Sequence, residues 1–380
     1  MCQFEIGSTV NTYNPTTTAA FQGPRFDHDP VSLACKGLLI EESRTNLILQ
    51  SEDFGTTWAA VNATVSTNVA TAPNGIVAAD KLIINSGSTA GRFSQLLTLT
   101  GFYVMSVFAK AGEWGWVFVT PLSNAGGVWF NLSNGTIGTQ NSGYSGFITS
   151  FGNGWYRCSV VSLGTTVAQT ARVTPTNADG LYTAGDGTSG ILAWGAQLEA
   201  GLFPTSYIPT TTASVIRSAD VCSISGSAFS GFYNPLEGSF ATSIIFNAPV
   251  SSTIGQVVFD VNDTTTLNRT RLLRNSTTGT AGYSNTVGGT QNVAIIGSTS
   301  ITANQIAKFS CCMKTNDFAV YLNNASQGTD VICTMQAAPT TLTIGDVSAG
   351  AARAPMNGTI DSLRYYKKRL SDSKLQILTV

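Results

Sequence analysis

Charged residues are scarce in this sequence. Lys, Arg, Asp and Glu make up 11% of its 380 residues, against about 25% in an ordinary soluble domain. The formal net charge is −1, so no overall field draws the chain to nucleic acid or to an anionic membrane surface. The single histidine, His28, lies between Asp27 and Asp29 in a turn. No Gly-x-Ser-x-Gly motif supplies a nucleophile. We therefore expect no serine-triad hydrolase and no nucleic-acid partner.

The cysteines lack the spacing of a metal site. There are seven, an odd number, without a Cys-x-x-Cys pair, so we expect free, buried thiols rather than zinc ligands or a disulfide framework. They are Cys2, Cys35, Cys158, Cys222, Cys311, Cys312 and Cys333. No apolar run approaches the length of a membrane span. No basic residue precedes Arg25 and no early apolar core is present, so we expect no signal peptide and synthesis in a cytoplasm.

What the chain has in quantity favours β-structure. Hydrophobic residues make up 43% of the sequence, which excludes a disordered chain. Thr, Ser, Asn and Gly dominate the remainder and favour strands joined by tight turns. Short apolar segments recur at even spacing on both sides of residues 200–216, where Pro204 and Pro209 cannot donate to a sheet. The sequence predicts an all-β fold of two tandem β-sandwiches, with a short C-terminal helix at 371–379.

The predicted organisation has three parts. Residues 1–49 form an extended N-terminal arm for attachment or oligomerisation, 50–212 a first sandwich and 213–380 a second. In the first sandwich the candidate strands are 78–84, 92–99, 103–109, 116–120, 128–132, 146–151, 156–162, 169–174 and 191–198. In the second they are 238–246, 256–260, 271–274, 292–296, 306–313, 318–322 and 341–344.

Several motifs resemble a known family. Arg-Phe-Asp-His-Asp-Pro (25–30) precedes Gly-Leu-Leu-Ile-Glu-Glu-Ser-Arg-Thr-Asn-Leu (37–47), and Trp-Gly-Ala-Gln-Leu-Glu-Ala-Gly (194–201) precedes Thr-Ser-Tyr-Ile-Pro-Thr (205–210) and Arg-Ser-Ala-Asp (217–220). These resemble bacteriophage virion proteins that join a carbohydrate-binding-module-like jelly roll to a concanavalin- or laminin-G-like sandwich. Such proteins occur as tail fibres, tailspikes or head-decoration proteins.

The resemblance implies a virion structural protein, a tail fibre or spike that binds host-surface polysaccharide. It also implies a homotrimer whose arm contacts other virion proteins, without membrane insertion. One alternative is a head-decoration or head-fibre protein. Another is a polysaccharide-degrading tailspike enzyme, which would need two carboxyl groups across a cleft. No such pair is evident, and Glu237 is the only glutamate after residue 213. We therefore expect no catalytic residues and no enzyme activity.

Glu41, Glu42 and Arg44 bring three charges together in a chain that has few. Adjacent strand residues point to opposite faces, which disfavours a catalytic carboxylate pair. We expect one of the glutamates to form an ion pair with Arg44.

Aromatic and acidic side chains supply the candidate ligand sites. Sugar rings stack on exposed aromatic faces, and Trp114, Trp116 and Tyr144 lie near glycine-rich turns where a side chain can reach solvent. No organic cofactor is indicated. Asp260, Asn262 and Asp263 could supply oxygen ligands for calcium, although the sequence around them lacks the EF-hand pattern. The alternative for these three residues is a set of turn-forming side chains.

Overall fold

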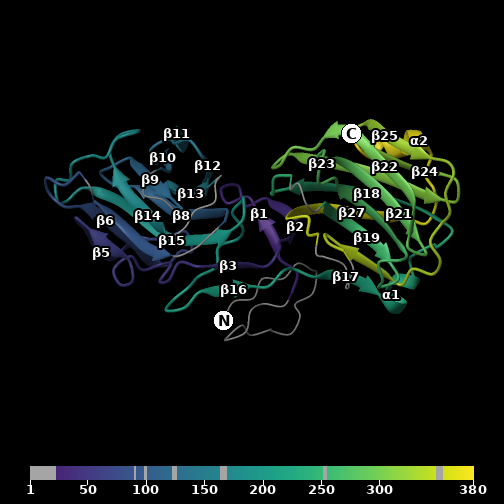
Figure 1. Ribbon diagram of the computed structural model, residues 1–380, viewed down its shortest axis with the longest axis horizontal. Coiled ribbons are helices and arrows are strands. Elements are labelled where there is room, and N and C mark those ends of the chain that lie inside the picture. The colour runs from purple at the N-terminus through teal and green to yellow at the C-terminus, as the bar shows by residue number, and fades with distance from the viewer. Residues whose placement is uncertain are drawn as a thin grey trace.

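The computed structural model describes residues 23–89, 91–97, 101–121, 126–162, 169–250, 255–347 and 354–380. These residues form two lobes, side by side, that are built almost entirely of strands (Figure 1). The helices among them are α1 (Gly226–Ser230) and α2 (Asp372–Ile377), of 5 and 6 residues. Neither is long enough to cross a membrane. The all-β expectation is confirmed.

The first lobe consists of two six-stranded antiparallel sheets. One has the strand order β12 (Tyr144–Ser150), β13 (Trp155–Ser162), β8 (Tyr103–Ala111), β15 (Gly190–Ala200), β6 (Val77–Ile84) and β5 (Ala63–Thr71). The other has the order β11 (Thr136–Gln140), β10 (Val128–Asn131), β9 (Trp116–Thr120), β14 (Gln169–Thr176), β7 (Arg92–Leu97) and β4 (Ala59–Val61). We call this lobe the first sandwich.

Strand periodicity explains the core of the first sandwich. Side chains alternate between the two faces of a strand, so Val117 and Val119 of β9 join the core cluster while Phe118 lies on the outer face. Met105 and Val107 of β8 meet them from the opposite sheet.

The second lobe, called the second sandwich, pairs a seven-stranded sheet with a six-stranded one. The larger has the order β1 (Phe26–His28), β2 (Cys35–Ile40), β27 (Gly358–Tyr366), β18 (Glu237–Phe246), β23 (Ile306–Lys314), β24 (Phe318–Leu322) and β25 (Ala325–Asp330). The smaller has the order β17 (Cys222–Ser225), β26 (Thr341–Ile344), β19 (Gln256–Asn262), β20 (Arg269–Arg274), β21 (Thr280–Val287) and β22 (Thr290–Ser300).

The segment expected to form an arm is partly built into this second sandwich. Strand β2 pairs with β27, and both lie near the centre of the molecule (Figure 1). Gly37 has a φ of +105°, and a Cβ atom there would lie 2.2 Å from the carbonyl oxygen of Ile360, so only glycine fits. Residues 1–22 of the expected arm lie outside the described residues, whereas β1 and β2 are strands of a sheet rather than an extension from it.

Residues 201–214 connect the two lobes and contain no strand or helix, as Pro204 and Pro209 predict. It then forms β16 (Val215–Arg217), which pairs with β3 (Arg44–Asn46) in a two-stranded sheet. This pairing joins the two parts of the chain that carry the motifs quoted above, residues 25–47 and 194–220, which we call the recognised motifs. It places them together at the junction of the lobes.

Candidate functional site

The junction is held by an ionic network centred on Glu41, whose residue is only 5% exposed. One carboxylate oxygen, Oε2, lies 3.0 Å from a terminal nitrogen of Arg25 and 3.0 Å from one of Arg217. The other, Oε1, accepts a hydrogen bond of 2.9 Å from the backbone N–H of Ser206. Two cations and one amide therefore satisfy a single buried carboxylate, and they come from two distant parts of the sequence, Arg25 from one and Ser206 and Arg217 from the other.

Further polar contacts extend this network on both sides. Asp220 accepts hydrogen bonds from the Arg25 side chain (Nε, 2.8 Å) and from the backbone N–H of Glu41 (2.7 Å). Glu199 accepts from the backbone N–H and the hydroxyl of Thr205, at 2.8 and 2.6 Å. The recognised motifs thus supply the residues that fix the two sandwiches against each other, which in turn sets the walls of a pocket.

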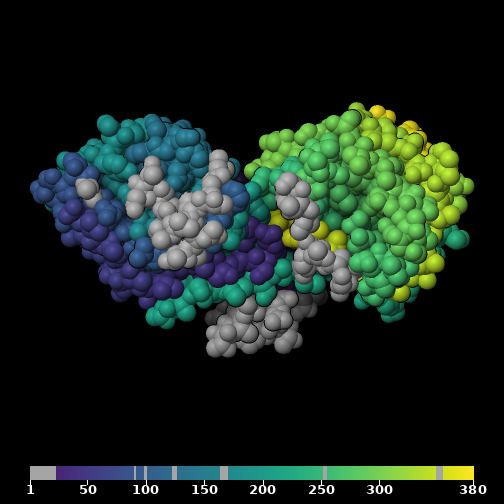
Figure 2. Space-filling view, viewed as in Figure 1, coloured from purple at the N-terminus to yellow at the C-terminus, as the bar shows by residue number. Residues whose placement is uncertain are grey.

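The pocket lies where the two lobes meet and has a volume of about 240 Å³; Figure 2 shows the narrow waist between them. Its lining combines the junction with two loops of the second sandwich. The lining residues are Glu42, Arg44, Gly201, Leu202, Phe203, Ala248, Pro249, Val250, Gly255, Gln256, Ala354, Pro355 and Asn357.

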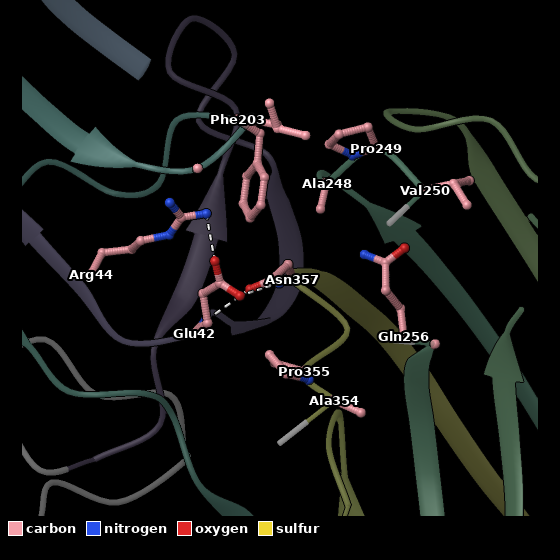
Figure 3. Close-up of a pocket in the computed structure, with 13 residues that line it drawn as sticks. Glu42, Arg44, Phe203, Ala248, Pro249, Val250, Gln256, Ala354, Pro355 and Asn357 are labelled. Atoms are coloured by element: carbon pink, nitrogen blue, oxygen red, sulfur yellow. Dashed lines mark hydrogen bonds and ion pairs between the residues drawn. The ribbon is translucent and has the colours of Figure 1, made fainter. Parts of the chain in front are cut away.

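One side of the pocket carries two charged side chains of opposite sign that form an ion pair (Figure 3). Glu42 Oε1 lies 2.5 Å from an Arg44 nitrogen, and Glu42 Oε2 accepts a hydrogen bond of 3.1 Å from the Asn357 side chain. The Arg44 guanidinium lies 4.7 Å from the centre of the Phe203 ring. Gly201 has a φ of +133°, a backbone conformation that other residues rarely adopt, and a Cβ atom there would lie 1.9 Å from an Arg44 nitrogen and displace the guanidinium. The expected pairing of a glutamate with Arg44 is confirmed, with Glu42 as the partner.

The other side of the pocket is mostly apolar. Pro249, Val250 and Pro355 form it, and the side chain of Gln256 projects toward Val250 (Figure 3). Gln256 Nε2 donates a hydrogen bond of 2.9 Å to the backbone carbonyl of Met356, and the residue is 6% exposed. The pocket therefore offers an aromatic ring and apolar surface together with a few oriented polar groups, which is the usual make-up of a small-molecule site.

The aromatic residues predicted from the sequence do not form a common platform. Trp114 is 5% exposed and belongs to the core of the first sandwich, so the prediction of an exposed indole is wrong. The physical reason is the close approach of Gly112 to Gly190, which lets the turn fold inward. There the backbone N–H of Trp114 donates a hydrogen bond of 3.1 Å to the backbone carbonyl of Gly190. Trp116 and Tyr144 are half-buried, on β9 and β12 of opposite sheets.

In the described part of the first sandwich, Tyr182 is an exposed aromatic residue whose ring packs against other aromatic rings. It is 45% exposed, and its ring lies 5.5 Å from Phe118 and 5.8 Å from Trp129 between centroids. The loop around it gave no signal in the sequence, because a tyrosine in a Gly/Thr-rich turn does not reveal which sheet face it covers.

The surroundings of two of the three candidate calcium ligands disfavour a cation. Asp260 and Asn262 are fully buried on β19, opposite Arg271 and Arg269 of β20, and these neighbouring positive charges disfavour a cation. The Asp263 carboxylate instead accepts hydrogen bonds from Thr265 and Asn268. Throughout the described ranges, no group of three or more His, Cys, Asp or Glu side chains could hold a metal ion.

The thiols are free, as expected, in all six cysteines of the described segments. Four are buried, Cys222 is half-buried and Cys35 is exposed, whereas Cys2 lies outside the described residues.

Comparison with known proteins gives similarity of fold only. No family model and no curated protein matches the chain. Among solved structures, domain 4 of the arabinanase AbnA from Geobacillus stearothermophilus, solved with arabinotriose, is 15% identical, covers 44% of this chain and 73% of its own, and has a TM-score of 0.34. A SAP-like pentraxin from Limulus polyphemus has 16% identity, coverage of 39% and 73%, and a TM-score of 0.31.

Domains LG4-5 of the mouse laminin alpha1 chain cover 72% of this chain and 85% of their own at 9% identity, with a TM-score of 0.30. The likeness of these proteins to the chain is one of β-sandwich fold. None of the three is described as a virion protein, so the virion resemblance rests on the sequence motifs alone.

Proposed function

We propose that this chain is a non-enzymatic virion protein of a bacteriophage that binds a host-surface glycan, with one sugar ring held in the junction pocket. The virion assignment is supported by the motifs at 25–47 and 194–220. The binding role is supported by one observation above all, a pocket of about 240 Å³ in which an aromatic ring lies beside oriented polar side chains. That volume is below the roughly 300–1,000 Å³ of sites for drug-sized ligands, which favours a single small ring.

The chemistry of the lining suits a sugar. The C–H face of a pyranose is apolar and packs on an aromatic ring, which Phe203 provides. The hydroxyl groups of a sugar need hydrogen-bond partners, because a buried polar group without one is costly. Gln256, Asn357 and the Glu42 carboxylate lie within the same lining. A sugar could therefore place its apolar face against the ring and its hydroxyls toward these groups.

The same lining supports binding without hydrolysis. Glycosidases use two carboxyl groups separated by about 5–9.5 Å across the bond that is cleaved. Glu42 is the one acidic residue among the lining residues, and both of its oxygens are engaged, by Arg44 and by Asn357.

A site of this size binds weakly. Single-site affinities on the order of micromolar to millimolar are expected for one ring. The trimer that we propose from the family resemblance would present three copies per spike, and several spikes per particle raise the avidity by about 10²–10⁴. Weak single sites are therefore sufficient for adsorption.

The test compares two variants on arrays of host-surface glycans. Phe203→Ala should abolish binding while leaving the urea midpoint of unfolding nearly unchanged, because the ring is only half-buried. Tyr182→Ala is the matched control, since it removes an exposed aromatic ring from the first sandwich. Loss of binding in the Tyr182 variant alone would move the site to that face.

The other parts of the proposal are tested separately. Release of new reducing ends from the bound polysaccharide, abolished by a single Asp or Glu substitution, would contradict the non-enzymatic role. Normal adsorption of particles that lack the protein would favour a head-decoration role instead.

A further inference from the structure

Arg274 is a buried cation without an acidic partner. The residue is 1% exposed and lies on the inner side of β20, where its guanidinium is 4.9 Å from the centre of the Phe246 ring. Its hydrogen bond is from Nη2 to the Ala248 carbonyl oxygen, at 3.2 Å. The Nε and Nη1 atoms are buried and have no hydrogen-bond partner within the described part of the chain.

Such an arrangement is costly unless something balances the charge. Moving an arginine out of water without a counter-ion is strongly unfavourable, and burial lowers the pKa of Arg274 to about 10 with no contribution from a neighbouring charge. Buried polar groups in folded proteins are nearly always satisfied, so an exception calls for an explanation such as a missing ion or ligand.

The position of Arg274 connects it to the junction pocket. Its direct cross-strand partner is Gln256, and its acceptor is the carbonyl of Ala248. Both of these residues line the pocket. Cross-strand side chains on one face lie within about 5.5 Å at Cβ, so the guanidinium lies directly behind the wall that Ala248 and Gln256 form.

The residues that line the pocket carry no net charge, because Glu42 and Arg44 form an ion pair and no other lining residue is ionisable. Two further charges lie behind the lining: the buried Asp346 carboxylate accepts a hydrogen bond of 2.7 Å from the backbone N–H of Ala354, and Arg274 lies behind Ala248 and Gln256. The positive charge therefore acts at the Ala248–Gln256 wall, where the surrounding protein screens charges far less than water does.

We propose that the junction pocket binds an acidic sugar, with the ligand's carboxylate at the Ala248–Gln256 wall, where the charge of Arg274 balances it. This inference rests on the proposed glycan-binding role and names the class of sugar. A carboxylate is the anion that sugars most simply supply, and its single negative charge matches the single positive charge behind the wall. Uronic acids and sialic acids both carry this group on a pyranose ring.

The experiment measures binding of matched sugar pairs by isothermal titration and ligand-observed NMR. The pairs are the methyl glycosides of glucuronic acid and glucose, those of galacturonic acid and galactose, and N-acetylneuraminic acid with its carboxyl-reduced alcohol. We expect at least one acidic member to bind about tenfold more tightly than its neutral partner at low salt, which is what one weakly screened charge pair provides. Raising the ionic strength should reduce this preference.

Two variants assign the preference to Arg274. Arg274→Met keeps the length of the side chain and removes the charge, so it should bind both members of each pair with the affinity that wild type shows for the neutral one. Arg274→Lys keeps the charge and should retain a preference of several-fold. An Arg274→Met protein that still prefers the acid would overturn the inference, as would a wild type that binds both members equally. If Arg274→Met does not fold, the same comparison is made with Arg274→Gln.

The two proposals fail in different ways. Equal binding of acidic and neutral sugars, lost in Phe203→Ala, would leave the glycan-binding role intact and remove only the acidic preference. Binding of no sugar by the wild type would overturn both.

Discussion

Removal of the Glu41 carboxylate should be among the most destabilising single substitutions at the junction. Glu41→Ala leaves Arg25 and Arg217 without their shared partner and removes the acceptor of the Ser206 N–H. Removing one partner of a buried ion pair costs about 3–5 kcal/mol. The side chains of Arg25 and Arg217 are 25% and 17% exposed, so water can partly replace the lost contact, and we expect a loss of about 3 kcal/mol, the lower end of that range.

The control is the exposed pair of Asp27 and Lys36, whose charged atoms lie 3.7 Å apart and whose side chains are both 35% exposed. Asp27→Ala should change the free energy of unfolding by about 0–1 kcal/mol. Urea unfolding followed by tryptophan fluorescence and by tyrosine near-ultraviolet circular dichroism measures both variants. All six tryptophans precede residue 213, so the fluorescence reports on the first sandwich, whereas the tyrosine signal comes from both sandwiches. A loss below about 1 kcal/mol for Glu41→Ala, similar to the control, would refute this account of the junction, because a buried pair is expected to exceed a surface one.

Two further predictions follow from burial. Trp114→Ala should lower the free energy of unfolding by about 3–5 kcal/mol, because it leaves a large cavity in the core of the first sandwich; a variant with wild-type stability in urea would contradict the placement of the indole. In native protein at pH 8, iodoacetamide should alkylate Cys35, which is exposed, while Cys158 and Cys311 stay unmodified, since burial raises the pKa of both thiols. Mass spectrometry of the peptides, with urea-unfolded protein as the control, checks this, and equal labelling of Cys35 and Cys158 would show that the core is open.

The junction explains why charges matter in a chain that has few of them. Glu41, Glu42, Arg44 and Arg217 all lie in the recognised motifs, and all four pair with one another or with Arg25. Separating the partners of a buried ion pair is costly, so the contacts of Glu41 with Arg25 and Arg217 disfavour other orientations of the two sandwiches. In our proposal, the same charges shape the pocket in which a glycan would bind.

Local features of the fold followed from the sequence. Strand-forming composition predicted an all-β protein, and the two prolines predicted the irregular segment at 201–214. The clustering of Glu42 with Arg44 predicted an ion pair that the structure contains. Each of these depends on interactions between residues close in sequence or on backbone preferences, which a sequence displays directly.

The pocket and the burial of individual side chains were decided only by the tertiary structure. The pocket is assembled from residues 42–44, 201–203, 248–256 and 354–357, and no local pattern indicates that these segments meet. Arg274 ends a strand with arginines on both of its faces. Alternation with a period of two fixes which residues share a face but not which face turns inward. The packing of this sheet against the other one, where Phe246 of β18 lies over the guanidinium, decided that this arginine is buried.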